Sequence, residues 1–517
     1  MTTKQANCPH FSERGQIIQD SVRYLFATIA GQGFGLIRSV MMPVLLNPAQ
    51  LGIWNLMNVV LSYGGNAQLG ILEGMNKLVP ILRGQGQIAQ VASVRDSVFW
   101  TNLILAVLAT SCVMLASFFV PLSYSKPLQT TAMIVLLLLV FYYLFSLLRA
   151  DNRFGLLSMG IMVLSALSTV LVLACGFFAD DHLLGALIGL ACAYGLTVFF
   201  WQWRSGYHYS FQMDRTSLRV SFSLGAPLIV LGVLSTVFLS VDRWVIAARL
   251  EEVQLGYYAL GIMASNLVSL IPSSVASVLY SRMLERFGAN SDPVSLRGLL
   301  INPTRAVAVL MAIIVGVAVL VLILVVRFFL PSYTPSVPIM TILIPGAFFY
   351  AVASIPGCFV TAINKQHWLM GIQGVCIGLG LSLSITFVFF GWGIVGVAVS
   401  TFIVYVIYGL GYTILSACFA FQARMEIVRF LGQVFMPFLA MALALVLGLL
   451  VIPTSAIFGD EVLRTAGRLA LMIAVLSLAL WWLNRDGKVM AVMREEVGAF
   501  LIAARQYQAR NKQNRKE

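Results

Sequence analysis

The sequence predicts an all-α polytopic membrane protein with about 14 transmembrane helices. Of the 517 residues, 60% are hydrophobic and only 10% are charged, whereas soluble globular proteins carry about 25% charged residues. Mean hydropathy is +0.91. Apolar runs long enough to cross a bilayer recur along the whole chain, and basic residues collect in alternate connections between them. These observations exclude a soluble globular protein.

A spanning helix needs about 20 mostly apolar residues. By this criterion the predicted spans begin near Tyr24, Leu51, Val94, Thr130, Phe154, Leu183, Ser221, Leu255, Thr304, Pro338, Leu369, Gly393, Val428 and Gly467. The second and eighth spans are interrupted by amides and hydroxyls: Asn55, Asn58, Asn66 and Gln68 in the second; Ser265, Asn266, Ser269, Ser273 and Ser274 in the eighth. Such helices are expected inside the bundle or beside water rather than against lipid.

Most of the 33 basic residues fall in one alternate set of connections and in the two termini. The positive-inside rule therefore places both termini in the cytoplasm. The net charge of +13 follows from this topology, and no nucleic acid partner is expected. The tail from Asn484 begins with an amphipathic pattern and ends in QARNKQNRKE, which favours an interfacial helix held by anionic membrane lipids.

Several classes of chemistry find no support in the sequence. The seven cysteines and four histidines are scattered, so neither a metal site nor a disulfide framework is indicated. No Walker A motif occurs. The outer loops, such as NPAQ, VPLSYSKP and RLEEVQ, have no room for a loop-borne catalytic site. We therefore expect no catalytic residue and no enzyme activity, in contrast to a membrane glycosyltransferase, polymerase or ligase.

The stretch from Gly225 to Gly256 carries an adjacent acid and base, Asp242 and Arg243, inside an apolar run. A charge at the centre of a spanning helix costs about 2.5–3.5 kcal/mol on insertion scales, so these two residues must be paired or must face water. Two interpretations are open: a structural ion pair that joins helices, or a substrate or ion site that lines a cavity.

This stretch has a counterpart near the N-terminus. A shift of 204 residues lays Gln50-Leu51-Gly52 over Gln254-Leu255-Gly256, and it lays Arg38 opposite Asp242. The same shift lays Gly84 over Gly288. Internal repeats of this kind are common in secondary transporters.

The order of these features resembles the polysaccharide branch of the flippase and exporter superfamily that includes Wzx-type oligosaccharide flippases, MurJ-type lipid II flippases and MATE exporters. The segments that carry the resemblance are LLNPAQLGIWNL, LGILEGMNKLVPILRGQG and SVDRWVIAARL with LGYYALG. The chain is most similar to the Wzx-like group, because an extra helix pair at 428–483 follows the 12 helices at which MATE proteins usually stop.

The resemblance implies two pseudo-symmetric six-helix bundles with a central cavity lined by the first, second, seventh and eighth helices. It divides the chain into a cytoplasmic N-terminal segment (1–20), an N-lobe (21–203), a cytoplasmic linker (204–220), a C-lobe (221–421), an extra helix pair (422–483) and a cytoplasmic tail (484–517). It also implies a bacterial cytoplasmic membrane location. The expected activity is alternating-access flipping of a polyprenyl-diphosphate-linked oligosaccharide for surface polysaccharide export, with polymerase or export machinery as partners.

For that substrate, Arg38 is the first candidate diphosphate ligand, because a guanidinium matches phosphate oxygens bidentately. Arg243 is the candidate in the second lobe. The sugar contacts are assigned to the amides of the second helix: Asn55, Asn58, Asn66 and Gln68. Asp242 is expected either to neutralise Arg38 or to take up H⁺ or Na⁺. No other cofactor is expected.

Two further alternatives are open. Glu73 and Lys77 lie four residues apart near the inner end of the second span, where they form either an ordinary surface pair or the cavity entrance. The alternative function is a MATE-type, cation-coupled drug or metabolite exporter, which would favour an apolar cavity with an acid over a cationic one.

Overall fold

The computed structural model describes residues 10–207, 209–211, 213–290, 292–452 and 457–483. The described residues form helices joined by short turns, with no strand among them. Each of the 14 predicted spans coincides with a helix or with a broken pair of helices, so the all-α polytopic fold is confirmed. The predicted tail helix from Asn484 lies outside the described residues.

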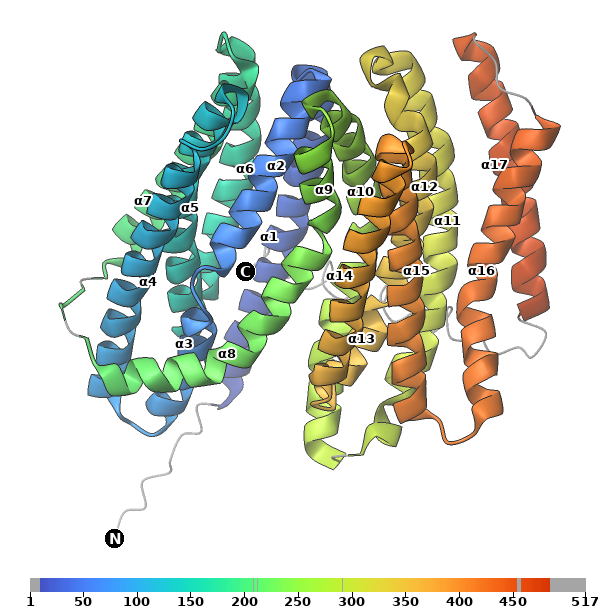
Figure 1. The fold of residues 1–517 in the computed structure, drawn as a ribbon. Coiled ribbons are helices and arrows are strands. Elements are labelled where there is room, and N and C mark those ends of the chain that lie inside the picture. The colour runs from blue at the N-terminus through green and yellow to red at the C-terminus, as the bar shows by residue number, and fades with distance from the viewer. Residues whose placement is uncertain (1–9, 208, 212, 291, 453–456, 484–517) are drawn as a thin grey trace, which may run out of the picture. The chain divides into compact units, whose positions relative to one another are not determined.

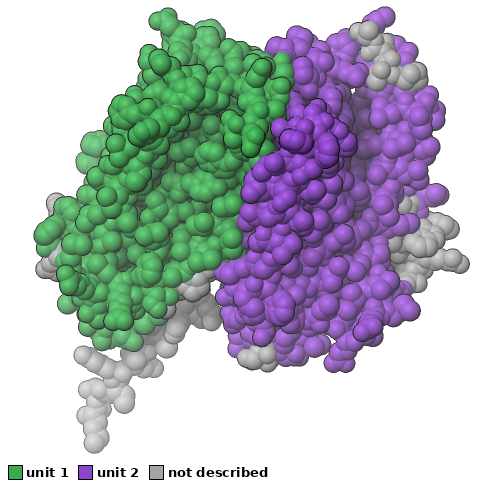
Figure 2. Space-filling model, viewed as in Figure 1, with its two compact units in different colours: residues 1–259 green, residues 260–517 purple. Residues whose placement is uncertain are grey.

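The helices of the chain group into two compact units, residues 1–259 and 260–517, coloured in Figure 2. The first unit contains α1 (His10–Leu45), α2 (Pro48–Asn66), α3 (Ile71–Gly84), α4 (Ile88–Ala116), α5 (Leu122–Ala150), α6 (Phe154–Phe178), α7 (His182–Ser205), α8 (Arg215–Phe238), α9 (Val241–Arg249) and the start of α10 (Glu252–Asn290). The first unit therefore extends beyond the predicted linker at 204–220 and includes the seventh predicted span. The proposed division into lobes stays a prediction.

The second unit contains the rest of α10 and the elements that follow it (Figure 1): η1 (Pro293–Leu296), α11 (Arg297–Phe329), η2 (Pro331–Ser336), α12 (Val337–Val352), α13 (Ser354–Ala362), α14 (Gln366–Phe389), α15 (Gly393–Ala420), α16 (Arg424–Val451) and α17 (Phe458–Leu483). Among the described residues, ten helices are long and apolar enough to cross a membrane, and the bent pair α8 and α9 would be an eleventh span. The chain is thus a multi-pass membrane protein.

Within the described residues three predicted spans are broken, and the polar second span is one of them. Between α2 and α3, Leu69 and Gly70 adopt positive φ angles of 51° and 78°, so the helix cannot continue through them. Between α8 and α9, the axis bends by 46° at Leu239 and Ser240. The third break lies at Ala353, between α12 and α13.

The turn before α2 explains the NPAQLG sequence. The Asn47 side chain accepts a hydrogen bond from Gln50 N at 2.9 Å, and Gln50 Oε1 accepts one from Asn47 N at 3.4 Å. This reciprocal arrangement is a capping box, and Pro48 occupies the first helical turn, where its missing N–H costs nothing. The start of α2 is therefore fixed by local chemistry.

The α16–α17 pair, whose helices lie side by side (Figure 1), is connected by Arg468, which also forms a buried ion pair within α17. Arg468 Nη1 donates to Glu461 Oε1 at 2.9 Å, and both side chains are 5% exposed. Arg468 Nε and Nη2 both donate to the carbonyl of Ile452, directly after α16, at 3.1 and 2.9 Å. The guanidinium thus satisfies a helix-end carbonyl that would otherwise lack a partner.

Candidate functional site

Arg38 lines a polar cavity inside the first compact unit. This cavity, which we call the Arg38 cavity, has a volume of about 340 Å³. Its walls come from five helices, α1, α2, α5, α6 and α7. The lining residues are Gly31, Gly35, Arg38, Asn58, Leu61, Ser62, Leu138, Tyr142, Leu164, Ser165, Ser168, Leu190 and Tyr194.

The spacing of residues in α1 explains why this cavity exists. Gly31, Gly35 and Arg38 follow one another at intervals of four and three residues, so they share one face of the helix. A Cβ on Gly35 would meet no atom within 4 Å, whereas one on Gly31 would lie 2.8 Å from Ser165 Oγ. Gly35 therefore leaves open space, and Arg38 lines the same cavity. On α2, Asn58 and Ser62 are likewise four residues apart and line the opposite wall.

The guanidinium of Arg38 is partly buried and has no hydrogen-bond or ion-pair partner among the described residues. No acidic residue belongs to the cavity lining, which instead carries the hydroxyl groups of two tyrosines and three serines. Arginine stays protonated in proteins, and an uncompensated charge away from bulk water is costly. The Ser62 and Ser168 hydroxyls donate to backbone carbonyls, which leaves the remaining lining hydroxyls as donors. A cation with such donors around it, and no carboxylate in the lining, suits an anionic group.

The other predicted sugar ligands do not line this cavity. Asn55 is 8% exposed, and its Oδ1 has no hydrogen-bond partner. Asn66 Nδ2 donates to Thr236 Oγ1 at 2.9 Å, which ties α2 to α8. Gln68 Oε1 is buried and also has no partner. Of the six residues predicted to bind substrate, the structure brings Arg38 and Asn58 together.

Asp242 lies in the first turn of α9, directly after the helix break, and is 4% exposed. Its carboxylate accepts a hydrogen bond from the Tyr258 hydroxyl at 2.6 Å and one from Arg243 N at 2.8 Å. Arg243 Nε lies 4.0 Å from Asp242 Oδ1 and makes no hydrogen bond. The carboxylate is thus held by Tyr258 and its own neighbour, and no ion pair joins it to Arg38 in the described part of the chain.

Glu73 and Lys77 both lie on α3, where Glu73 is partly buried and Lys77 is exposed. No ion pair joins the two in the part of the chain that the structure describes. Neither residue lines the Arg38 cavity, and a role at a cavity entrance stays a prediction.

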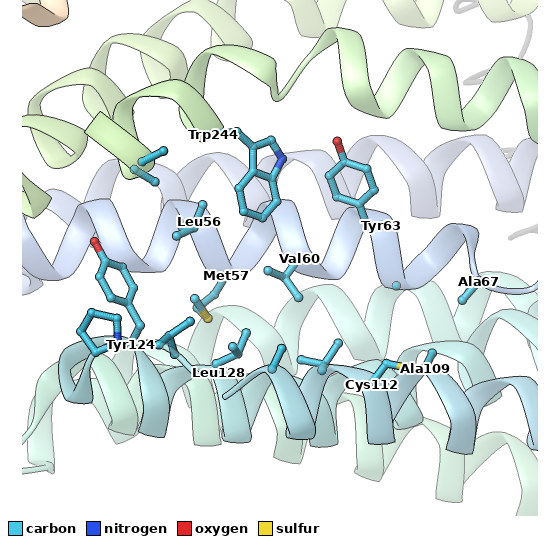
Figure 3. Close-up of a pocket in the computed structure, with 17 residues that line it drawn as sticks. Leu56, Met57, Val60, Tyr63, Ala67, Ala109, Cys112, Tyr124, Leu128 and Trp244 are labelled. Atoms are coloured by element: carbon cyan, nitrogen blue, oxygen red, sulfur yellow. The ribbon is translucent and has the colours of Figure 1, made fainter. Parts of the chain in front are cut away.

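A second cavity, which sequence reasoning did not anticipate, lies between α2, α4, α5 and α9 (Figure 3). This apolar cavity has a volume of about 700 Å³. Its lining is Leu56, Met57, Val60, Tyr63, Gly64, Ala67, Ala109, Cys112, Val113, Ala116, Val120, Pro121, Tyr124, Leu128, Trp244, Ala247 and Ala248. The signal in the sequence was the recurrence of small residues on these helices, which alone does not predict a cavity.

Helix α2 separates the two cavities. Its residues Asn58, Leu61 and Ser62 line the Arg38 cavity, whereas Leu56, Met57, Val60, Tyr63 and Gly64 line the apolar cavity. Tyr63 reaches the break between α8 and α9, because its hydroxyl is hydrogen-bonded to Ser240 Oγ at 2.8 Å. Its ring lies beside that of Trp244, with centroids 6.1 Å apart.

Comparisons with known proteins place this fold among membrane transporters. No protein-family model matches the sequence, and no curated protein matches it. A solved structure titled lipid II flippase MurJ in an inward closed conformation matches with a TM-score of 0.66 and 16% identity. The match covers 91% of this chain and 99% of that chain.

Two MATE structures also match. An inward-facing multidrug resistance MATE family transporter of the MOP superfamily has a TM-score of 0.62 at 12% identity, covering 77% of this chain and 95% of that one. A point mutant of the Vibrio cholerae MATE transporter VcmN has a TM-score of 0.53 at 16% identity, with the same coverages. At these identities the likeness concerns the fold. This chain therefore has the fold shared by MurJ and the MATE transporters of the MOP superfamily.

Proposed function

We propose that this protein is a flippase that moves a polyprenyl-diphosphate-linked oligosaccharide across the bacterial cytoplasmic membrane by alternating access. One observation carries the proposal. The guanidinium of Arg38 has no partner among the described residues, and the polar cavity that it lines contains no carboxylate. Such a cation needs an anionic partner, and a diphosphate is one that a guanidinium binds bidentately.

The size of the Arg38 cavity limits what it can hold. About 340 Å³ is near the lower end of ligand pockets, which run from about 300 to 1,000 Å³. In this mechanism the diphosphate enters the cavity, where hydroxyls of Tyr142, Tyr194 and Ser165 are available as further donors. The glycan remains outside it, and the identity of the sugar is set elsewhere.

Fold coverage also supports a flippase. The lipid II flippase match extends over 91% of this chain, whereas the two MATE matches extend over 77%. In the proposed function the chain works with both termini in the cytoplasm, beside anionic lipids and together with polymerase or export machinery. Coupling to H⁺ or Na⁺ would act through Asp242, the buried acid held by Tyr258.

One observation favours a MATE-type exporter as the second candidate. The apolar cavity, with Trp244 and Tyr63 in its wall, has the size and lining of a site for a hydrophobic small molecule. Such an exporter would not require the cation at Arg38, so the two candidates differ in how a substitution there acts.

The test uses the full chain in vesicles that contain a fluorescent polyprenyl-diphosphate oligosaccharide. The fraction of the lipid in the outer leaflet is followed with a membrane-impermeant quencher. We expect Arg38→Ala to slow flipping roughly tenfold or more, since hydrogen bonds to a charged group contribute about 1.5–3 kcal/mol. We expect Arg38→Lys to retain part of the rate because it keeps the charge.

The matched control is Arg219→Ala, which removes an exposed cation from α8 and should leave the rate unchanged. Wild-type rates for Arg38→Ala would refute the role of the cation. If the wild-type protein moves no glycolipid but accumulates an apolar fluorescent cation in the vesicles, the exporter replaces the flippase.

A further inference from the structure

The apolar cavity is bounded partly by α4 and α5, two helices long and apolar enough to cross a membrane. It offers almost no polar group to a ligand. Its lining consists of aliphatic, aromatic and sulfur-bearing side chains, apart from the hydroxyls of two tyrosines and the Trp244 indole. The Tyr63 hydroxyl is already used in the hydrogen bond to Ser240. Water in such a space would lack partners, because a buried water typically makes about three hydrogen bonds.

Small residues create this space. Ala67, directly after α2, and Ala109 and Ala116 on α4 form wall positions with small side chains. Protein interiors are close-packed, with few voids larger than a water molecule. The apolar cavity of about 700 Å³ is instead within the size range of ligand pockets, about 300–1,000 Å³.

The rim of the cavity makes it accessible from the surface of the molecule. Cys112, Ala116 and Pro121 are exposed at the rim, and Trp244 is 42% exposed. The neighbouring surface of α4 is apolar, with Val107, Leu108 and Leu115 more than half exposed. In a multi-pass protein such a surface faces lipid, so hydrocarbon reaches the cavity from the bilayer.

The position of α2 indicates which class of lipid fits the apolar cavity. Met57 and Val60 line the apolar cavity, while Asn58 and Leu61, their neighbours in sequence, line the Arg38 cavity. The two cavities therefore lie at the same level of one helix, on its opposite faces. An amphiphile with an anionic head and a long flexible chain matches both, whereas a lipid with an uncharged head matches one of them.

The chemistry of the walls favours an isoprenoid over a saturated chain. Each isoprene unit carries a planar double bond and a methyl branch. The rings of Tyr63, Tyr124 and Trp244 offer flat faces to such groups (Figure 3), and the alanine-lined side accommodates branches. Aromatic side chains supply large apolar contact areas of this kind.

We propose that the apolar cavity between α2, α4, α5 and α9 holds part of the isoprenoid chain of the transported lipid. This inference rests on the proposed function for the identity of the lipid, because a polyprenyl diphosphate supplies both the chain and the anion. It assigns a second substrate contact to the helix that also lines the Arg38 cavity.

The test is photo-crosslinking to the full chain in lipid nanodiscs. The probe is a polyprenyl diphosphate without sugar that carries a diazirine on its chain. We expect crosslinks to α2 and α4 within residues 56–67 and 109–116. An excess of unlabelled polyprenyl diphosphate should remove them, and an equal excess of phosphatidylglycerol should not.

The variant that tests the cavity is Ala109→Phe, which fills it from α4. We expect at least a fivefold loss of crosslinking. The matched control is Leu108→Phe, which adds a ring next to it at an exposed position outside the cavity and should keep the wild-type yield.

Two results would overturn this inference. Competition by phosphatidylglycerol as strong as that by polyprenyl diphosphate would show that any acyl chain fills the cavity. Crosslinks that map elsewhere would show that the chain binds another surface. The readout of this experiment is binding. If the protein crosslinks as expected but flips no glycolipid, the proposed function is refuted and the isoprenoid-binding site in the apolar cavity is retained.

Discussion

Gly52 in α2 and Gly256 in α10 pack backbone against backbone. A Cβ atom on Gly52 would lie 2.7 Å from Gly256 N, and one on Gly256 would lie 1.7 Å from the carbonyl oxygen of Pro48. The two glycines are related by the same shift of 204 residues that aligns the two halves of the sequence. The repeated QLG turn therefore meets its own counterpart, as expected where a symmetric pair of elements contacts itself.

A side chain at this contact should be poorly tolerated. We expect Gly256→Ala to lower the free energy of unfolding by about 1–3 kcal/mol, the usual cost of overpacking, or to prevent folding. The measurement is thermal unfolding of the purified full chain in detergent. Gly84→Ala and Gly288→Ala are matched controls, because a Cβ at either position would meet no atom within 4 Å. Equal melting temperatures for all three variants would contradict the contact.

The hydroxyl of Tyr258 should stabilise the protein through Asp242. The carboxylate is 4% exposed and accepts this hydroxyl at 2.6 Å. Tyr258→Phe should cost about 1–3 kcal/mol, since it removes the donor of a buried charged acceptor. Tyr63→Phe removes a hydroxyl whose partner, Ser240, is neutral and should cost less, about 0.5–1.5 kcal/mol. Unfolding curves of the two variants that coincide would argue against a stabilising Tyr258–Asp242 hydrogen bond.

Breaking the Arg468–Glu461 pair should be more harmful than removing it. Glu461→Gln and Arg468→Met each remove one member of this buried ion pair, and breaking such a pair costs about 3–5 kcal/mol. The double variant should lose less stability than the sum of the losses in the two single variants. By comparison, Arg464→Met breaks a pair with Asp460 whose side chains are 33% and 41% exposed and should cost about 0–1 kcal/mol. Additive losses in a double-mutant cycle would contradict a direct interaction.

The start of α8 should loosen in acid. The Ser217 hydroxyl and the Thr216 and Ser217 amides donate to Asp214, and they hold the pKa of its carboxyl below the usual value. A lowered folded-state pKa contributes stability that is present above the unfolded pKa, about 3.9, and is lost as pH falls through the folded-state value. Hydrogen exchange at residues 215–218 should therefore accelerate below about pH 4.

The matched variant for this experiment is Asp214→Asn, which keeps an N-cap oxygen but does not titrate. Its exchange rates at residues 215–218, corrected for intrinsic pH effects, should be the same above and below about pH 4. If the wild-type chain also shows no acceleration, the cap does not depend on the charge of Asp214.

The sequence was sufficient to predict the helices, because length and apolarity decide whether a segment spans a membrane. Arg38 and Asn58, which the sequence suggested as substrate ligands, line one cavity, and their role in binding stays a prediction. The sequence did not predict the breaks at Leu69 and Ser240, which depend on backbone angles rather than composition. It also did not predict the partners of Asp242 and Asn66, because Tyr258 and Thr236 are placed by tertiary packing.

The hydrogen bonds between Arg468 of α17 and the carbonyl after α16 bear on how the chain enters the membrane. The carbonyl of Ile452 at the end of α16 is satisfied by Arg468, which is synthesised 16 residues later. Until α17 has left the ribosome, this carbonyl lacks its Arg468 donor, and hydrocarbon offers none. The guanidinium in turn reaches its position already neutralised by Glu461 of its own helix. We therefore expect α16 and α17 to insert as one unit, completed only when both have reached the translocon.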